Sequence, residues 1–156
     1  MTPNEFLDFV FGDRGDEETI CVAKGSPKDN GDTLFWNVAP EHEIFTGWKK
    51  RPERNKQAWY FCVSATSGTL NEKGTALRRR REDLTRYHCL VLDDIGTKAE
   101  EPPVEPAWKL ESSAGNYQWG YLLEPDDQFG AYEALLEWAH EQGWGDGGAG
   151  GSYRLM

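Results

Sequence analysis

Tyr87-His88-Cys89-Leu90-Val91-Leu92-Asp93-Asp94 is an apolar run that ends in two carboxylates. A short, continuous apolar run of this kind is typical of a β-strand that is buried on both faces. The two aspartates come directly after the run, where a polar turn is expected. The sequence therefore predicts a buried strand at the centre of the fold, with a pair of acidic side chains at its end.

Five other segments are rich in β-branched or aromatic residues and are bounded by Gly, Pro, Asn or Asp, which is the pattern of short strands. They cover residues 19–23, 33–38, 58–64, 107–113 and 117–123. The last two segments are joined by Ala114-Gly115-Asn116, which predicts an antiparallel hairpin whose turn needs a positive φ.

Helices are predicted at the two ends of the chain. Thr2-Pro3-Asn4-Glu5 has the spacing of a capping box with a first-turn proline, ahead of apolar residues. A second helix is predicted over residues 128–142, capped by Asp126 or Asp127 and ended by Gly143. Many strands and few helices indicate an α+β fold with a mainly antiparallel sheet and flanking helices, and fit a doubly wound sheet less well.

Length and composition are those of one compact domain covering residues 1–156. Apolar residues make up 38% of the chain, and a chain of 156 residues buries roughly two-thirds of its unfolded surface. The formal net charge of -10 opposes sequence-blind attraction to nucleic acid, so a nucleic-acid role needs a local basic patch or a metal. The three cysteines are far apart among apolar neighbours, which predicts buried thiols in a reducing cytoplasm. With neither a signal pattern nor an apolar stretch of membrane-spanning length, we expect a soluble, intracellular protein.

The acidic pair Asp93-Asp94 is the first candidate for chemistry. Carboxylates held at the end of a strand are hard oxygen ligands that suit Mg²⁺ or Mn²⁺. The alternative is that Asp-Asp-Ile-Gly is only a well-capped turn, and for an isolated acidic pair that alternative is favoured. Lys98, four residues beyond Asp94, either faces a phosphate or is solvated.

The second candidate is the segment Glu111-Ser112-Ser113-Ala114-Gly115-Asn116-Tyr117-Gln118-Trp119. Its small hydroxyl residues and glycine permit close backbone approach, and Asn116 and Gln118 supply amide donors for a triphosphate or sugar. A plain hairpin turn would need only the glycine and the asparagine. The additional serines and glutamine favour a site.

Basic residues gather in two places. Arg78, Arg79, Arg80, Arg81 and Arg86 offer guanidiniums that can bind phosphate, although such runs are usually solvated. A second group, formed by Lys49, Lys50, Arg51, Arg54 and Lys56, lies beside Trp48 and Trp59 and is compatible with single-strand binding. The three histidines lack the spacing of metal ligands, and His88 is predicted to be structural.

The runs Leu90-Val91-Leu92-Asp93-Asp94-Ile95-Gly96 and residues 111–119 resemble, in content, order and separation, the paired motifs of RepB-type primases of phages, prophages and plasmids. These enzymes belong to the archaeo-eukaryotic primase superfamily. The resemblance covers about half of the chain and implies an RRM-like catalytic core. It implies that Asp93 and Asp94 bind the divalent metal, Mg²⁺ or Mn²⁺, and that Ser113, Asn116 and Gln118 bind the nucleotide.

The family's third motif supplies another carboxylate before an Arg-rich segment, and Ser152-Tyr153-Arg154-Leu155-Met156 resembles the start of that segment. The expected acidic position falls near Gly150 or Gly151, whereas Asp146 lies several residues earlier. Either Asp146 substitutes through a loop shift, or the third metal ligand is missing and this chain alone is inactive. The resemblance thus implies a domain that is incomplete at its carboxyl end.

The function implied is that of a DNA primase or polymerase-like nucleotidyltransferase in a mobile-element replication protein of a bacterial cytoplasm. Its partners would be nucleoside triphosphates, a single-stranded DNA template contacted by Arg78, Arg79, Arg80 and Arg81, and a fused or separate helicase, without a membrane. Two alternatives are open. One is a non-catalytic replication-initiation module that binds DNA, and the other is a metal-dependent nuclease built on the same acids.

Overall fold

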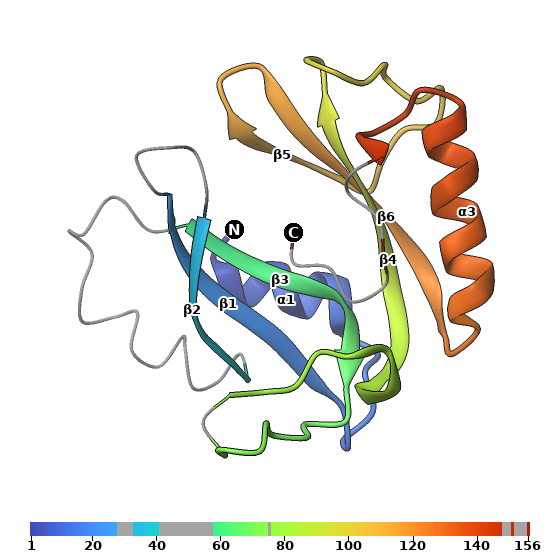
Figure 1. Cartoon of the computed structure of the whole chain (residues 1–156). Coiled ribbons are helices and arrows are strands. Elements are labelled where there is room, and N and C mark those ends of the chain that lie inside the picture. The colour runs from blue at the N-terminus through green and yellow to red at the C-terminus, as the bar shows by residue number, and fades with distance from the viewer. Residues whose placement is uncertain (28–32, 41–57, 75, 148–150, 152–155) are drawn as a thin grey trace.

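The computed structural model describes residues 1–27, 33–40, 58–74, 76–147, 151 and 156, with the backbone alone for residues 24–27, 33–40, 58 and 59. Within this part of the chain, six strands form one antiparallel sheet in the order β2-β1-β3-β4-β6-β5 (Figure 1). The strands are β1 (Thr19–Pro27), β2 (Thr33–Pro40), β3 (Ala58–Thr66), β4 (Leu84–Ile95), β5 (Trp108–Ser113) and β6 (Asn116–Asp126). The predicted α+β fold with a mainly antiparallel sheet is confirmed, and an RRM-like core stays a prediction.

The central strand β4 is longer than the predicted segment 87–92. Leu90, Val91 and Leu92 are all buried, so both faces of the strand are covered, as its apolar run predicted. Along β6 the pairing reaches Ile95, with a register shift between Leu92 and Ile95. Asp93 and Asp94 therefore lie inside an irregular end of β4 and not in a turn after it.

The sheet divides between β3 and β4. These two strands pair at Ser64↔Tyr87 and Thr66↔Leu84 and then diverge. Next to the diverging part of β3, Met156 is buried and exchanges two backbone hydrogen bonds with Phe61, of 2.9 and 2.8 Å. The reciprocal pair is the pattern of two antiparallel neighbours in a sheet, so Met156 continues the pairing where β4 has left β3.

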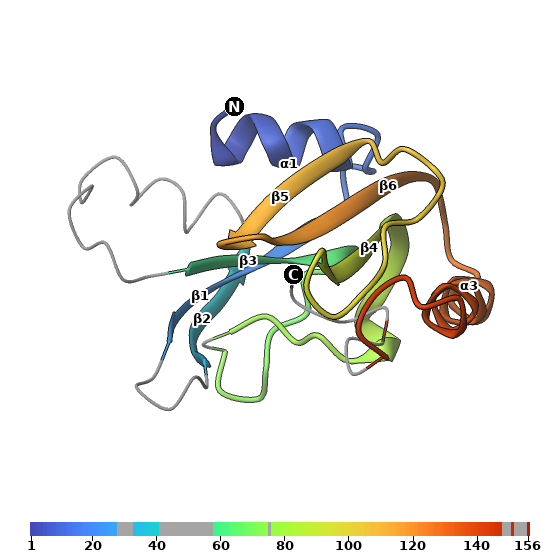
Figure 2. The ribbon, with the colours of Figure 1, turned by 90° about the horizontal axis from the view of Figure 1, so that it is seen from above.

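Helix α1 (Pro3–Phe11) has the predicted capping box, in which Thr2 accepts from the Glu5 amide and Glu5 accepts from the Thr2 amide. Figure 2 shows α1 lying across one face of the sheet. Phe6 packs edge-to-face on Phe61 and Trp108, and Phe11 packs on Phe61. The amphipathic side of α1 thereby closes the core over β3 and β5.

Helix α3 (Phe129–Glu141) lies beside β4 and β6 (Figures 1 and 2). Phe129 packs edge-to-face against Tyr87 of β4, and the ring of Tyr132 packs against the same tyrosine at a tilt. The predicted cap by Asp126 or Asp127 is wrong in detail, because the N-cap residue is Gln128, whose amide donates to Asp126 Oδ1 at 2.9 Å. The helix ends at Glu141, one residue before the predicted end, and Gly143, the predicted stop, takes a φ of 82°.

The polar segment between β3 and β4 and the apolar surroundings of the cysteines also agree with what the sequence predicts. Between β3 and β4 the described chain is irregular apart from a 3-10 helix, η1 (Arg81–Asp83), and the bridge Leu70↔Leu77. Cys21, Cys62 and Cys89 are buried thiols outside any disulfide, as predicted, and burial raises the pKa of Cys62 to about 11. Among the described residues, no helix combines the length and apolarity needed to cross a membrane.

Candidate active site

The last residues of β4 and the turn that follows them form one segment, residues 93–99, which we call the acidic turn. Asp94 has a φ of 63°, which non-glycine residues seldom adopt. Its carbonyl oxygen accepts from the amides of Lys98 and Ala99, both at 3.1 Å, and Asp93 Oδ1 accepts from the Asp94 amide at 2.9 Å. These bonds hold the backbone of Asp94 in the left-handed conformation.

A side chain at the start of β6 bonds the hairpin between β5 and β6 directly to the acidic turn. Asn116 Nδ2 donates to Asp94 Oδ1 at 2.8 Å. The Thr97 hydroxyl lies 2.9 Å from Asn116 Oδ1 and 3.1 Å from the Asp94 carbonyl, and donates to one of them at a time. The two segments that the sequence singled out are therefore joined directly. Asn116, expected to contact a nucleotide, uses its amide to orient Asp94.

Asp146 also reaches the acidic turn. The chain after α3 runs along this turn, because Glu100 N donates to the Gly143 carbonyl at 2.9 Å and Asp146 N donates to the Asp93 carbonyl at 3.3 Å. Lys98 Nζ lies 2.6 Å from Asp94 Oδ2 and 3.6 Å from Asp146 Oδ2. One ammonium thus bridges two carboxylates that are 52 residues apart in the chain, and its hydrogen bond to Asp94 raises the pKa of Lys98.

The donor set suits a cation that is bound only in part by protein. Over the described ranges, no three His, Cys, Asp or Glu side chains are grouped so that they could hold a metal ion alone. However, Asp94 and Asp146 already share one cationic group, Lys98 Nζ. Mg²⁺ is commonly held by one or two carboxylates and completed by water and phosphate oxygens. The arrangement fits a metal that arrives together with a phosphate.

The other predicted nucleotide residues lie on the same hairpin. Ser113 is exposed and pairs with Asn116 in the register, whereas Gln118 is 8% exposed and lies opposite Leu110. The turn is held by Ser112 Oγ, which donates to the Asn116 carbonyl at 3.2 Å, and Gly115 has the predicted positive φ of 72°. Within the described part of the chain, Asn116 is the one of these three residues that hydrogen-bonds to the acidic turn.

Sequence reasoning missed Thr97. It stands three residues after Asp94, a spacing at which a hydroxyl reaches back to a turn carbonyl, so the signal was local.

The arginine run lies at the other end of β4 from the acidic turn. Arg78 makes a two-point bond with the buried Asp83, of 3.1 and 2.6 Å. Arg81 pairs with Glu133 of α3 at 3.2 Å, Arg80 lies 3.7 Å from Glu82, and Arg79 is half-buried. Part of the run therefore holds the start of β4 together. The second basic group, with Trp48, lies outside the described residues, and so does most of the segment 152–156.

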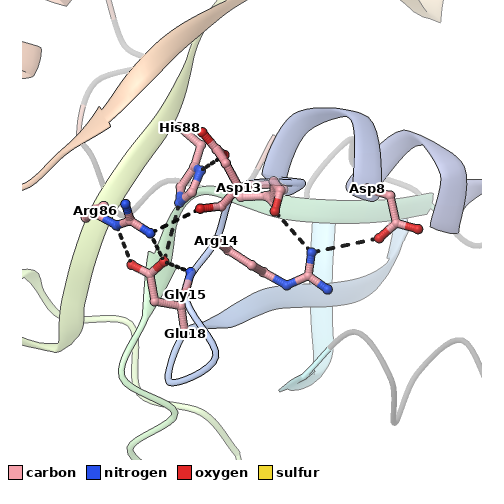
Figure 3. Close-up of polar contacts among 8 residues, drawn as sticks. Asp8, Asp13, Arg14, Gly15, Glu18, Arg86 and His88 are labelled. Atoms are coloured by element: carbon pink, nitrogen blue, oxygen red, sulfur yellow. Dashed lines mark hydrogen bonds and ion pairs between the residues drawn. The ribbon is translucent and has the colours of Figure 1, made fainter.

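A second polar group, which we call the Glu18 cluster, consists of Asp13, Glu18, Arg86 and His88 (Figure 3). Arg86 Nε donates to Glu18 Oε1 at 3.0 Å, and Arg86 Nη2 donates to Glu18 Oε2. The hydrogen bonds from Arg86 lower the pKa of Glu18 to about 2, and burial lowers the pKa of His88. The ring of His88 is fully buried against Phe11, with Nδ1 3.4 Å from Asp13 Oδ1.

The Glu18 cluster ties the loop after α1 to β4. Arg86, which the sequence grouped with phosphate-binding arginines, is engaged by Glu18, 68 residues away in the chain. No local pattern predicts such a pair, so this role of Glu18 was missed. The buried position of His88 agrees with the structural role predicted for it.

Gly96 permits the close approach of the acidic turn to the hairpin. Its φ is 87°, and a Cβ added there would lie 3.0 Å from the Gly115 carbonyl oxygen. We expect Gly96→Ala to destabilise the fold by about 2–3 kcal/mol, from left-handed strain plus this contact. It should also shift the NMR signals of the Asn116 side-chain amide, because the Asp94 bond lengthens.

Gly74→Ala is the matched control for Gly96→Ala. Gly74 has a φ of 64°, with no heavy atom within 4 Å of an added Cβ. Gly74→Ala should lower the free energy of unfolding by about 1–2 kcal/mol, from strain alone, and should leave the Asn116 signals unchanged. Equal losses of stability and unshifted Asn116 signals in both variants would show that the contact is unimportant. Urea unfolding and two-dimensional NMR provide the two measurements.

Comparisons with protein-family models, with curated proteins and with solved structures found no match for this chain. Function is therefore inferred from the geometry of the acidic turn and the hairpin.

Proposed function

We propose that this chain is a primase-like or polymerase-like nucleotidyltransferase domain of a mobile-element replication protein. It would join nucleotides on a single-stranded template, in the cytoplasm of a bacterial host. The observation that carries the proposal is the 2.8 Å hydrogen bond from Asn116 to Asp94, which joins the acidic turn to the Ser-Ala-Gly-Asn hairpin. A well-capped turn alone would not need this connection to a second polar segment 22 residues away.

Each residue has a distinct role in this proposal. Asp94 and Asp146 would hold Mg²⁺ or Mn²⁺, with Asp93 fixing the Asp94 amide. Asn116 is a positioning residue, because it acts through the Asp94 carboxylate. Ser113 and Gln118 of the same hairpin would contact the nucleotide. A metal bound here would neutralise phosphate charge while the 3′ hydroxyl of the growing strand bonds to the α-phosphorus, the bond to the β-phosphate breaks, pyrophosphate leaves and the hydroxyl proton passes to solvent.

The template and further partners belong to the same proposal. The net charge of -10 opposes nucleic acid over most of the surface, so the template needs local basic groups. Arg79, Arg80 and Arg81 could supply them at the start of β4, since Arg78 is held by Asp83. The nine residue steps from Leu84 to Asp93 correspond to about 30 Å of extended strand. A helicase, fused or separate, would open the duplex ahead of this domain.

Isothermal titration calorimetry tests the proposal. ATP and dATP are titrated into the folded chain with Mn²⁺ and then with EDTA in place of Mn²⁺. We expect nucleotide binding with Mn²⁺ and at least tenfold weaker binding with EDTA, because the carboxylates repel a bare triphosphate. Folded protein that binds neither nucleotide in the presence of Mn²⁺ would overturn the proposal.

The same samples distinguish the two alternatives when labelled single-stranded DNA is added. DNA binding that weakens with salt but is indifferent to EDTA and to Asp93→Ala would indicate a non-catalytic DNA-binding module. Mn²⁺-dependent degradation of the strand, without extension, would indicate a nuclease. Extension of a primer by this chain or by a longer one is the result that the proposal predicts.

A further inference from the structure

Lys98 occupies the position between carboxylates that a metal would need. Its Nζ lies 2.6 Å from Asp94 Oδ2 and 3.6 Å from Asp146 Oδ2. Oδ1, the second oxygen of Asp94, accepts from Asn116. Both oxygens of this carboxylate are thus already engaged, one by a neutral amide and one by a cation. Of these two partners, the Lys98 ammonium carries a positive charge, so it competes with a metal ion for the negative charge of Asp94.

We propose that Lys98 is a displaceable counterion that keeps the acidic turn neutralised until a metal and a triphosphate arrive together, and that then binds the triphosphate. This inference rests on the proposed function of the acidic turn. A divalent metal binds a carboxylate oxygen at about 2.0–2.6 Å, so on Asp94 Oδ2 it would lie close to the Lys98 ammonium, and the two cations would repel each other. Metal entry therefore favours the departure of Lys98 from Asp94.

The side chain is free to make this movement sterically. Its exposed fraction is 69%, against 15% for Asp94, so the flexible stem of Lys98 lies in solvent while its partner is mostly buried. A lysine ammonium is a compact point charge on a rotatable four-carbon stem and binds phosphate readily. Displaced from Asp94, it lies beside the same turn, where a metal-bound triphosphate would be within its reach.

Lys98 should have opposite effects on the binding of a metal ion alone and of a metal ion with a triphosphate. A metal alone must displace Lys98 without offering it a new partner, so metal binding without nucleotide is weak. A metal with a triphosphate supplies phosphate oxygens to the displaced ammonium. Lys98 thereby favours the complete substrate over the bare ion and acts as a specificity-determining residue.

Lys98→Met tests this inference, because methionine keeps much of the length and removes the charge. We expect Mn²⁺ alone, measured by the electron paramagnetic resonance signal of free Mn²⁺, to bind Lys98→Met about tenfold more tightly than the wild type, an order-of-magnitude figure for one competing unit charge. ATP and dATP with Mn²⁺ should bind Lys98→Met about tenfold more weakly. Lys98→Arg, which keeps the charge, should bind Mn²⁺ alone as weakly as the wild type.

Lys73→Met is the control, because Lys73 is exposed and lies in the loop between β3 and β4. It should leave both affinities unchanged. If the wild type binds nucleotide with Mn²⁺ but Lys98→Met does not gain affinity for Mn²⁺ alone, the counterion role is wrong and the proposed function stands. If the wild type does not bind nucleotide with Mn²⁺ at all, both are wrong. Circular dichroism of each variant confirms that it is folded.

Discussion

Asp94→Asn is expected to weaken Mn²⁺-dependent nucleotide binding about 100-fold, the loss typical of removing one preorganised electrostatic group. The substitution removes the charge that Lys98 and the metal share and keeps the shape of the side chain. Asparagine also adopts left-handed backbone readily, so the φ of 63° at this position is preserved. Calorimetry with ATP and Mn²⁺ measures the change, which therefore reports on charge and not on the turn.

Asp127→Asn is the control for this prediction, since Asp127 is exposed in the loop before α3. It should bind nucleotide as the wild type does. Asp93→Asn should have a smaller effect than Asp94→Asn, because Asp93 Oδ1 accepts from the Asp94 amide. A loss of nucleotide affinity below threefold in Asp94→Asn would show that Asp94 is not part of the site. A larger loss in Asp93→Asn than in Asp94→Asn would show that Asp93 has the role proposed for Asp94.

Glu18→Gln is expected to lower the free energy of unfolding by about 3 kcal/mol, the size found when one partner of a buried ion pair is removed. The Glu18 side chain is 7% exposed and that of Arg86 is 33% exposed, so the substitution leaves a partly buried guanidinium without its two-point carboxylate partner. The hydrogen bonds from Arg86, which lower the pKa of Glu18 to about 2, have the direction expected of a stabilising pair. Urea unfolding at pH 7 measures the loss.

The lowered pKa values of Glu18 and His88 also predict how the stability of the fold changes with pH. Because the folded-state pKa of Glu18 is lowered, its stabilisation is present above pH 4.5 and is lost as the pH falls towards 2. His88, whose pKa is also lowered, contributes stability above pH 6.5 that is lost as the pH falls further. In Glu18→Gln the acid loss between pH 5 and 2 should be smaller than in the wild type. An unchanged acid profile would be inconsistent with this pair.

Glu105→Gln is the matched control for Glu18→Gln. Glu105 is 82% exposed and pairs with Lys109 at 3.1 Å, so its loss should cost about 0–1 kcal/mol. A double-mutant cycle with Arg86→Met isolates the Glu18–Arg86 energy from the effects of either side chain alone. Additive losses would show that the two residues do not interact. Equal losses in Glu18→Gln and Glu105→Gln would show that burial of the pair has no effect.

The elements of the fold could be predicted because their signals are local. The capping box of α1 lies within Thr2 to Glu5, Gly115 specifies the hairpin turn, and the apolar residues 90–92 predict the buried part of β4. The ends of β4 could not be predicted, because polar residues extend it at both sides. Arg86 lies within the strand since Glu18 compensates its charge from a distant loop.

The site could be predicted in its residue types and only partly in its arrangement. Asp94 and the 111–119 segment were identified from composition and from the resemblance. That Asn116 binds Asp94 depends on the pairing of β4 with β6, which no local pattern specifies. The position of Asp146 depends on the path of the chain after α3 along the acidic turn. Both contacts are tertiary, so the sequence left the roles of these residues open.

One NMR measurement tests directly whether the acidic turn and the hairpin form a single metal and nucleotide site. Mn²⁺ is added with ATP to ¹⁵N-labelled protein, and paramagnetic broadening is followed at each amide. We predict that the signals of residues 94–98, 115–116 and 146 broaden together in the wild type and not in Asp94→Asn, while those of residues 78–83 stay sharp. Broadening confined to residues 78–83, or broadening at the acidic turn that persists in Asp94→Asn, would contradict the proposed site.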